Sequence, residues 1–332
     1  MTDGDTRISE RELQHAQVLV GQIGSFFDQR VVGQRNLRTA LLCTVMAGGH
    51  ILLESVPGLA KTTAAQALAA SISGSFHRIQ CTPDLMPNDI VGTQILNYST
   101  GTFSTQLGPV HANVVLMDEI NRSSAKTQSA MLEAMQERQT SIGGEVHPLP
   151  RPFVVLATQN PIEEEGTYVL PEAQMDRFLL KEVLDYPAPP EEIEVLGRIS
   201  SGAQSAPMTG NPVSLEDVRF LQDLTRRVYV DDAIRRYIVA LVATTRGGGP
   251  APIAGLQRHV RVGASPRGSI ALMQIAQSLA VLAGRAYVIP EDVKALRHSV
   301  LRHRLVRTLD ALVDGVSAES LIDAVFAAVP TP

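Results

Sequence analysis

The chain has 332 residues, of which 44% are hydrophobic and 19% charged, and its formal net charge is -5. This describes a globular protein longer than one typical domain, and it excludes a disordered or fibrous chain. No apolar run approaches the roughly 20 residues that span a bilayer, the acidic N-terminal residues do not resemble a secretory signal, and two cysteines exclude a disulfide framework, so we expect a cytoplasmic protein with no membrane segment.

Residues 50–185 show the alternation expected of a parallel sheet covered by helices. Short apolar runs of strand length alternate there with helical patterns, and three of the runs are almost continuously apolar, as strands buried on both faces are. Between two of them, residues 123–138 carry Met131, Ala134 and Met135 at the spacing of one helix face. The five expected strands are residues 50–53, 76–81, 113–117, 153–157 and 178–184.

The C-terminal part of the chain differs in pattern and in charge. Residues 1–212 hold 14 basic and 23 acidic side chains, a net charge of -9, whereas residues 213–332 hold 15 and 11, a net charge of +4. Ser214, Ser265 with Pro266, and Ile289 with Pro290 each fit a helix start, and no strand pattern of similar quality follows residue 190. We expect an N-terminal helical segment (1–30), an α/β core (31–190), a linker (191–213) and a smaller all-helical domain (214–332).

The segment after the first expected strand resembles a phosphate-binding loop. Residues 54–63 read Glu-Ser-Val-Pro-Gly-Leu-Ala-Lys-Thr-Thr. In such a loop backbone N–H groups surround phosphate, a lysine reaches the outer phosphates and the next hydroxyl binds Mg²⁺. Gly58, Lys61 and Thr62 fit these roles, whereas Ser55 and Ala60 stand at the two positions where glycine is usual. The other residues expected to line the nucleotide are Val56, Pro57, Leu59 and Thr63.

The two missing glycines put the loop in question without excluding it. Glycine is required only where φ is positive or where a Cβ would strike the nucleotide. Serine and alanine are among the smallest replacements, and position 60 can take a helical φ if the helix opens there. We therefore expect ATP binding, and the alternative is a chance succession of strand, turn and helix.

Two adjacent acids, Asp118 and Glu119, follow the apolar run at residues 113–117. Open α/β sheets bind ligands at the carboxyl ends of their strands. There Asp118 would hold Mg²⁺ through water, and Glu119 would orient and polarise the attacking water. An acid pair can also begin a turn or cap a helix, but its occurrence together with the loop favours a Mg²⁺-dependent ATPase. Thr158 or Asn160, after the next apolar run, is placed to contact the γ-phosphate or that water.

Five segments together closely resemble the MoxR family of AAA+ ATPases, and the similarity runs over about residues 10 to 330. In that family alanine is usual before the lysine, so Ala60 conforms, whereas Ser55 stands where glycine is normal and departs from the pattern. The segments are Val31-Val32-Gly33-Gln34, Val56-Pro57-Gly58-Leu59-Ala60-Lys61-Thr62, Met117-Asp118-Glu119-Ile120-Asn121-Arg122, Ala157-Thr158-Gln159-Asn160-Pro161 and Pro171-Glu172-Ala173-Gln174-Met175-Asp176-Arg177-Phe178.

The resemblance implies an α/β fold, an AAA+ αβα sandwich with a five-stranded parallel sheet, followed by a smaller all-helical lid domain. It also implies a ring, usually a hexamer, with ATP bound between neighbours. Asn160 would be the first sensor and Arg267 the second, reaching from the lid. Arg177 resembles the finger that stabilises charge on the next subunit's γ-phosphate, with Arg122 as a second candidate. The alternative for Arg177 is an ion pair at a helix end.

Three further features are interpreted through the same resemblance. Val31, Val32 and Gly33 match the family segment that packs around adenine, and core packing is the alternative. Residues 89–107 and 140–150 are expected to form β-hairpins, the second turned by Gly143 and Gly144. In the family such hairpins face the pore or the substrate side of the ring, and ordinary surface hairpins are the alternative.

Three functions remain open from the sequence. The first is an ATP-hydrolysing, chaperone-like remodeller that matures a protein client or helps insert its metal or cofactor, with a von Willebrand factor A domain protein as the partner implied by the resemblance. The second is a DNA-remodelling motor, although the acidic first domain and the lack of an added DNA-binding module argue against nucleic acid. The third is an ATP-binding scaffold that hardly hydrolyses ATP because Ser55 impairs the loop.

Overall fold

The computed structural model describes residues 7–56, 58–161, 168–204 and 206–332. Its centre is a five-stranded sheet in which all neighbouring strands are parallel, in the order β2-β5-β8-β1-β9. The expected strands are confirmed to within two residues at either end. They are β1 (Ile51–Glu54), β2 (Phe76–Gln80), β5 (Val114–Asp118), β8 (Val154–Gln159) and β9 (Leu180–Val183).

Helices cover both faces of this sheet because the side chains of each strand alternate between the two sides. Ile51 and Leu53 pack into one buried cluster with α1 (Glu10–Arg30), α2 (Arg35–Ala47) and α3 (Lys61–Ala70). Leu52 packs into the other, with Met131 and Met135 of α5 (Ala125–Glu137). The three-layer αβα sandwich therefore follows from the nearly continuous apolar strands, which have two faces to bury.

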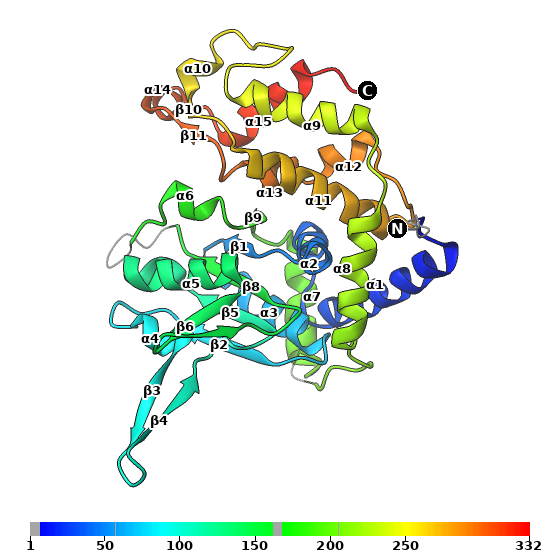
Figure 1. Ribbon diagram of the computed structural model, residues 1–332. Helices are drawn as coiled ribbons and strands as arrows, with labels where there is room; N and C mark the ends of the chain where they lie inside the picture. The colour runs from blue at the N-terminus through cyan, green and yellow to red at the C-terminus, as the bar shows by residue number, and fades with distance from the viewer. Residues whose placement is uncertain (1–6, 57, 162–167, 205) are drawn as a thin grey trace, which may run out of the picture.

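Two hairpins are confirmed where the sequence predicts them. The first joins β3 (Gly92–Asn97) to β4 (Thr102–Leu107), follows α4 (Pro87–Val91), and extends away from the body at the lower left of Figure 1. The second joins β6 (Gln139–Ile142) to β7 (Glu145–Pro148). Its turn residues Gly143 and Gly144 have φ of +59° and +88°, which glycine adopts at little cost.

The C-terminal part is helical with two differences from the prediction. A short antiparallel ribbon joins β10 (Val260–Val262) to β11 (Val306–Arg307), and strands this short leave no alternating pattern in a sequence. Helix α7 also occupies the first half of the expected linker. The helices are α7 (Pro189–Ser200), α8 (Leu215–Arg227), α9 (Asp232–Thr245), α10 (Leu256–His259), α11 (Pro266–Leu282), α12 (Pro290–Ala295), α13 (Arg297–Leu301), α14 (Leu309–Val313) and α15 (Ala318–Ala328).

Helix starts in this region agree with the sequence. Ser214 and Ser265 cap α8 and α11 by accepting a hydrogen bond from the backbone N–H of Asp217 and of Arg267 respectively. Pro290 is the first residue of α12, where its missing N–H costs nothing. Within the described ranges, no helix is both long enough and apolar enough to cross a membrane.

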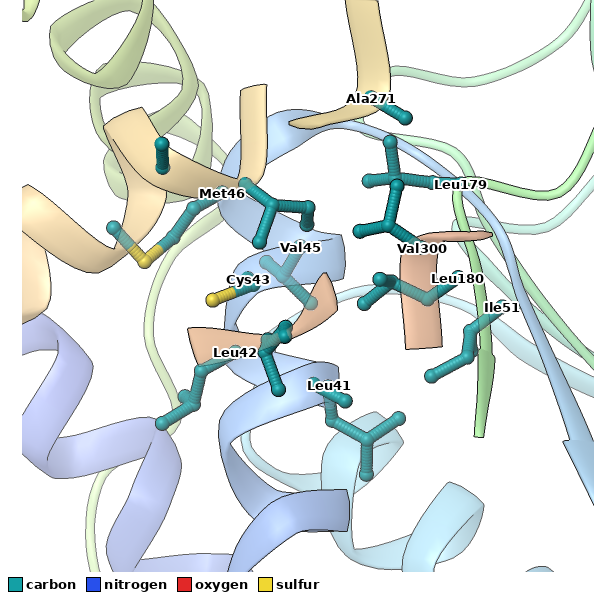
Figure 2. Close-up of a cluster of buried hydrophobic side chains, with 14 of the residues drawn as sticks. Leu41, Leu42, Cys43, Val45, Met46, Ile51, Leu179, Leu180, Ala271 and Val300 are labelled. Atoms are coloured by element: carbon teal, nitrogen blue, oxygen red, sulfur yellow. The ribbon is translucent and has the colours of Figure 1, made fainter. Parts of the chain in front are cut away.

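The lid packs directly on the core through one continuous apolar cluster. Figure 1 shows the lid helices above the sheet, with α2 between the two layers. Figure 2 shows that α2 contributes its buried side chains to the sheet and to lid helices α11 and α13 alike. The labelled residues there are Leu41, Leu42, Cys43, Val45, Met46, Ile51, Leu179, Leu180, Ala271 and Val300. Burial also raises the pKa of the Cys43 thiol, which keeps this cysteine protonated.

Candidate active site

The candidate phosphate loop lies between β1 and α3, and Lys61 is the first residue of that helix. The Lys61 ammonium donates a hydrogen bond to the carbonyl oxygen of Ser55, 2.8 Å away. Gly58 has a φ of +87°, so the loop uses glycine at the point where the backbone turns left-handed. Pro57, which the sequence also assigns to the nucleotide, lies outside the described residues.

Ser55 does not take a backbone conformation that requires glycine. It is 3% exposed and is absent from the described residues with positive φ. Its amide donates to the carbonyl of Gln159 at 3.3 Å, and its hydroxyl donates to the carbonyl of Val56 at 2.9 Å. A serine therefore satisfies its polar groups here without strain, and the first missing glycine costs the loop nothing in conformation.

Ala60 has a strained backbone rather than the helical φ that it could take if the helix opened there. Its φ is +58° and its ψ is 19°, in the left-handed region. The helix begins one residue later, at Lys61, so position 60 still belongs to the turn that reverses the chain into the helix. A left-handed alanine costs about 1–2 kcal/mol relative to a right-handed one. The condition for a helical φ, that the helix already opens at position 60, is therefore not met.

Thr158 joins the two candidate acids. Its hydroxyl donates to Oδ1 of Asp118 at 2.7 Å and accepts the backbone N–H of Glu119 at 2.8 Å. Thr158 is fully buried and Asp118 is 7% exposed. Because β5 and β8 are neighbours in the sheet, the ends of both strands contribute to one site. Of the two polar residues that the sequence offered for this site, Thr158 and Asn160, Thr158 thus positions the acids.

The carboxylate of Glu119 is held from two sides. Gln80 at the end of β2 donates an amide hydrogen bond to its Oε2 at 3.1 Å, and Arg122 pairs with the same oxygen at 3.1 Å. Glu119 itself has a left-handed φ of +58° and precedes the single turn η1 (Ile120–Arg122). Such a conformation in a side chain larger than glycine is concentrated at functional sites. Arg122 therefore faces the acid of its own chain.

Thr62 and Asp118 provide the oxygen atoms that Mg²⁺ prefers. The Thr62 hydroxyl lies 3.5 Å from Oδ2 of Asp118. A hydroxyl and a carboxylate oxygen that lie this close together can both bind one small cation. The substrate phosphates would supply further oxygen ligands. The two residues assigned to the metal are thus brought together by the fold and fit that group.

Arg78 is a residue of this site that the sequence reasoning missed. Its guanidinium on β2 contacts Oδ2 of Asp118 with two nitrogens, at 3.2 Å and 2.6 Å. It also donates to the amide oxygen of Gln80 at 3.0 Å. Only the register of β2 on β5, which pairs Gln80 with Asp118, brings these side chains together. In the sequence they are two polar residues in an ordinary edge strand.

The segment expected to contact adenine includes Val31 and Gly33, and the expected first sensor is Asn160. Val31 is 5% exposed and belongs to the apolar core, so core packing accounts for that valine. Gly33 has a φ of +65°, and the carboxylate of Glu191 in α7 lies where a side chain at this position would extend. Asn160, directly after β8, is 4% exposed, and its carbonyl accepts the Asn121 amide at 3.4 Å.

Arg177 and Arg267 line a cavity away from the loop of their own chain. The cavity, of about 460 Å³, is also lined by Gly48, Gly49 and His50, which precede β1, whereas the loop follows β1. The four residues of β1 rise about 13 Å between these two ends. Arg267 donates to the Gln136 side chain at 3.2 Å, and Arg177 to the Leu132 carbonyl at 2.8 Å. The structure does not bring Arg267 to the phosphate loop of the same chain.

Positive charge exceeds negative charge in this cavity. Among the described residues that line it, four are arginines and one is an acid, namely Arg138, Arg177, Arg267 and Arg304 against Asp176. Asp176 is fully engaged, because it accepts from Arg304 at 2.9 Å and from the Ser265 hydroxyl at 2.7 Å. Burial lowers the pKa of Arg304 to about 10, although Asp176 opposes this shift. An anion would relieve the remaining repulsion.

A strand, phosphate loop and helix, an acid pair on another parallel strand of the same sheet and a helical lid together define an AAA-type ATPase. The family model for ATPases associated with various cellular activities (AAA) matches residues 50–180, and the model for the AAA lid domain matches residues 256–325. Within this class, the chain belongs to the MoxR family. The relatives that establish this membership cover most of the chain.

The chaperone MoxR1 of Mycobacterium tuberculosis is 47% identical over 91% of this chain and 79% of that protein. The Bacillus subtilis protein YeaC is 45% identical over 95% of both chains. A crystal structure of a protein from Cytophaga hutchinsonii is 40% identical, superposes with a TM-score of 0.88, and covers 97% of this chain and 98% of its own. The fold and the family are therefore the same along nearly the whole length.

Proposed function

We propose that this protein hydrolyses ATP with Mg²⁺ at the loop between β1 and α3. The observation that supports this most is the convergence of Lys61, Thr62, Asp118 and Glu119 at the carboxyl ends of β1 and β5. Thr158 of the intervening strand β8 is bound to both acids. Lys61 and the first N–H groups of α3 would hold the phosphates. Mg²⁺, bound through Thr62 and Asp118, would neutralise phosphate charge.

Glu119 is the proposed general base. Its carboxylate would orient the attacking water and take its proton, a role that needs a fixed and ionised acid. Gln80 and Arg122 hold the carboxylate, and the hydrogen bond from the Glu119 amide to Thr158 holds the backbone. Asn160 would contact the γ-phosphate or the same water from the end of β8.

Arg177 and Arg267 are proposed to act on the nucleotide of a neighbouring subunit in a ring, most simply a hexamer. Their cavity lies at the opposite end of β1 from the loop, and it carries three more positive charges than negative ones. A polyphosphate that reaches the cavity from a neighbour would balance that excess. This extends the finger assignment to Arg267, whose sensor role would then be exercised on the next subunit.

The ring would act as a chaperone-like remodeller in the cytoplasm. The support is membership of the MoxR family, in which the Mycobacterium tuberculosis relative is named a chaperone. We propose a protein client that is matured, or that receives a metal or cofactor, together with a von Willebrand factor A domain protein as partner. Recovery of proteins retained by a Glu119→Gln variant in the presence of ATP would test this part directly.

Steady-state ATP hydrolysis and ATP binding, measured side by side, test the enzymatic part. Glu119→Gln is expected to lower turnover by at least about a hundredfold, as loss of a general base does, while ATP binding persists. Glu133→Gln is the matched control, because it makes the same chemical change at an exposed site of α5. If the wild type binds ATP but hydrolyses it no faster than Glu119→Gln, the protein is a nucleotide-dependent scaffold.

A further inference from the structure

We propose that the side chain of Arg78 takes the place of the metal at Asp118. It pairs with Asp118 when no metal is bound, and it must release Asp118 when Mg²⁺ binds. This inference rests on the proposed binding of Mg²⁺ and nucleotide at the loop. It assigns Arg78 a positioning role that sets the Mg²⁺ concentration at which the site is half saturated. The contacts of Asp118, its burial and the edge position of β2 carry the inference.

The two oxygens of Asp118 have different partners. Oδ1 accepts the hydroxyl of the fully buried Thr158. Oδ2 faces the Thr62 hydroxyl at 3.5 Å, and this same oxygen receives both nitrogens of Arg78. Thr158 is locked between the two acids, so Oδ2 is the oxygen that a metal beside Thr62 would use. Arg78 therefore occupies the oxygen through which the metal would be held.

A buried carboxylate needs a positive partner, which explains why Arg78 is there. The side chain of Asp118 is 10% exposed, and an uncompensated charge at such a site costs several kcal/mol. Mg²⁺ held by Oδ2, directly or through a water, would lie close to the guanidinium, and the repulsion between the two cations makes the two contacts compete. The two bound states are therefore alternatives, and binding of the metal is an exchange of one cation for another.

Arg78 has room to leave. Its side chain is 48% exposed, and β2 is the outer strand of the sheet beyond β5. Within the described part of the chain, its other hydrogen bond is to the Gln80 amide oxygen on the same strand, at 3.0 Å. A long side chain on an edge strand can rotate into water without disturbing the core. The exchange therefore needs a rotamer change and no movement of the sheet.

The Mg²⁺ dependence of nucleotide binding tests the proposal without reference to turnover. A fluorescent ATP analogue is titrated with Mg²⁺ on the wild type and on Arg78→Gln. Losing the competing contact should lower the half-saturating Mg²⁺ concentration about tenfold, the equivalent of one charge-assisted hydrogen bond. Affinity for the analogue in EDTA should stay within about threefold of wild type, since the loop itself is unchanged.

Two control variants separate the direct contact from general charge effects. Arg78→Lys keeps the charge but loses the two-nitrogen contact, so its Mg²⁺ requirement should fall between those of the wild type and Arg78→Gln. Arg235→Gln removes an arginine from an exposed ion pair with Asp232 in α9 and should leave the requirement unchanged. A fall in the requirement of Arg235→Gln equal to that of Arg78→Gln would overturn the proposal.

Other outcomes are equally decisive. An unchanged Mg²⁺ requirement in Arg78→Gln, with nucleotide binding intact, refutes the exchange and leaves the proposed ATPase untouched. Loss of nucleotide binding in EDTA together with a lower unfolding temperature would make Arg78 a structural ion pair and would also refute it. A wild type that binds no nucleotide would instead refute the proposed function itself.

Discussion

At the scale of single residues, the two positions of the loop where glycine is replaced, Ser55 and Ala60, differ in backbone conformation. Ser55 has ordinary backbone geometry and satisfied polar groups, whereas Ala60 and Gly58 are both left-handed, with φ of +58° and +87°. Of the two replacements, only Ala60 therefore has a conformational cost. The alanine at position 60 is therefore tolerated with strain, and the serine at position 55 is tolerated without it.

Ser55→Gly is accordingly expected to change ATP affinity and turnover by less than about threefold, because the position gains nothing from a left-handed option. Its unfolding free energy should fall by roughly 0.5–1 kcal/mol through added freedom of the unfolded chain. Nucleotide titration and urea unfolding measure the two quantities. Gly58→Ala is the contrasting variant, and it should weaken nucleotide binding by straining the loop. A tenfold gain in turnover in Ser55→Gly would show that serine does impair the site.

At the scale of elements, His50 forms hydrogen bonds to both β8 and α5, and the two bonds together require one protonation state of its ring. Its Nδ1 accepts the backbone N–H of Val155 at 3.0 Å, so Nε2 must carry the proton that reaches the carbonyl of Met135 at 3.2 Å. A second proton on Nδ1 would point at an N–H group. Burial, with a smaller contribution from the Arg138 charge, lowers the pKa of His50 to about 3.

This geometry predicts a loss of stability in mild acid. The unfolded chain takes up a proton at His50 near pH 6.5, whereas the folded protein does not until about pH 3. Stability from this group is thus complete above pH 6.5 and falls as the pH drops, by about 2 kcal/mol between pH 6.5 and pH 5. Urea unfolding at several pH values should give a flatter dependence in His50→Gln than in the wild type. Equal slopes would contradict the assignment.

At the scale of the whole molecule, the lid and the core are joined beside the arginine cavity. The apolar cluster around α2 spans both parts (Figure 2), and the buried pair of Arg304 and Asp176 links the lid to the residue preceding Arg177. Ser265, which caps α11 next to Arg267, bonds the same Asp176. The position of the lid therefore fixes Arg177 and Arg267 relative to one another.

If both arginines act on a neighbour's nucleotide, inactive variants should complement each other. Lys61→Ala and Arg177→Ala are each expected to lose hydrolysis. When equal amounts of the two variants exchange subunits freely, each head-to-tail interface has a chance of about one half of an intact loop and about one half of an intact arginine. About a quarter of the interfaces would therefore have both. ATP hydrolysis should recover towards about that fraction of wild type.

The same mixing experiment carries its own control. A mixture of Arg177→Ala with Arg267→Ala should not recover, because each interface would then lack one of the two arginines. Lys61→Ala with Arg267→Ala should recover as the first mixture does. Absence of recovery in every mixture, with rings still assembled, would place the arginines in the site of their own chain.

The sequence by itself determined the five strands, the two hairpins, the phosphate loop and the acid pair. Each depends on neighbouring residues, since alternation, turn glycines and a polar residue at a strand end are local patterns. The charge asymmetry likewise separated the lid from the core. The left-handed φ of Ala60 was not determined in this way, because it depends on where the helix begins.

Only the tertiary structure decided which side chains of different elements contact one another. The contact of Arg78 with Asp118 depends on the register of β2 against β5, and 40 residues separate the two in the sequence. The location of Arg267 beside Arg177, rather than at the loop, depends on how the lid docks on α2. Register and docking arise from burial of apolar surface over the whole molecule, which no local pattern encodes.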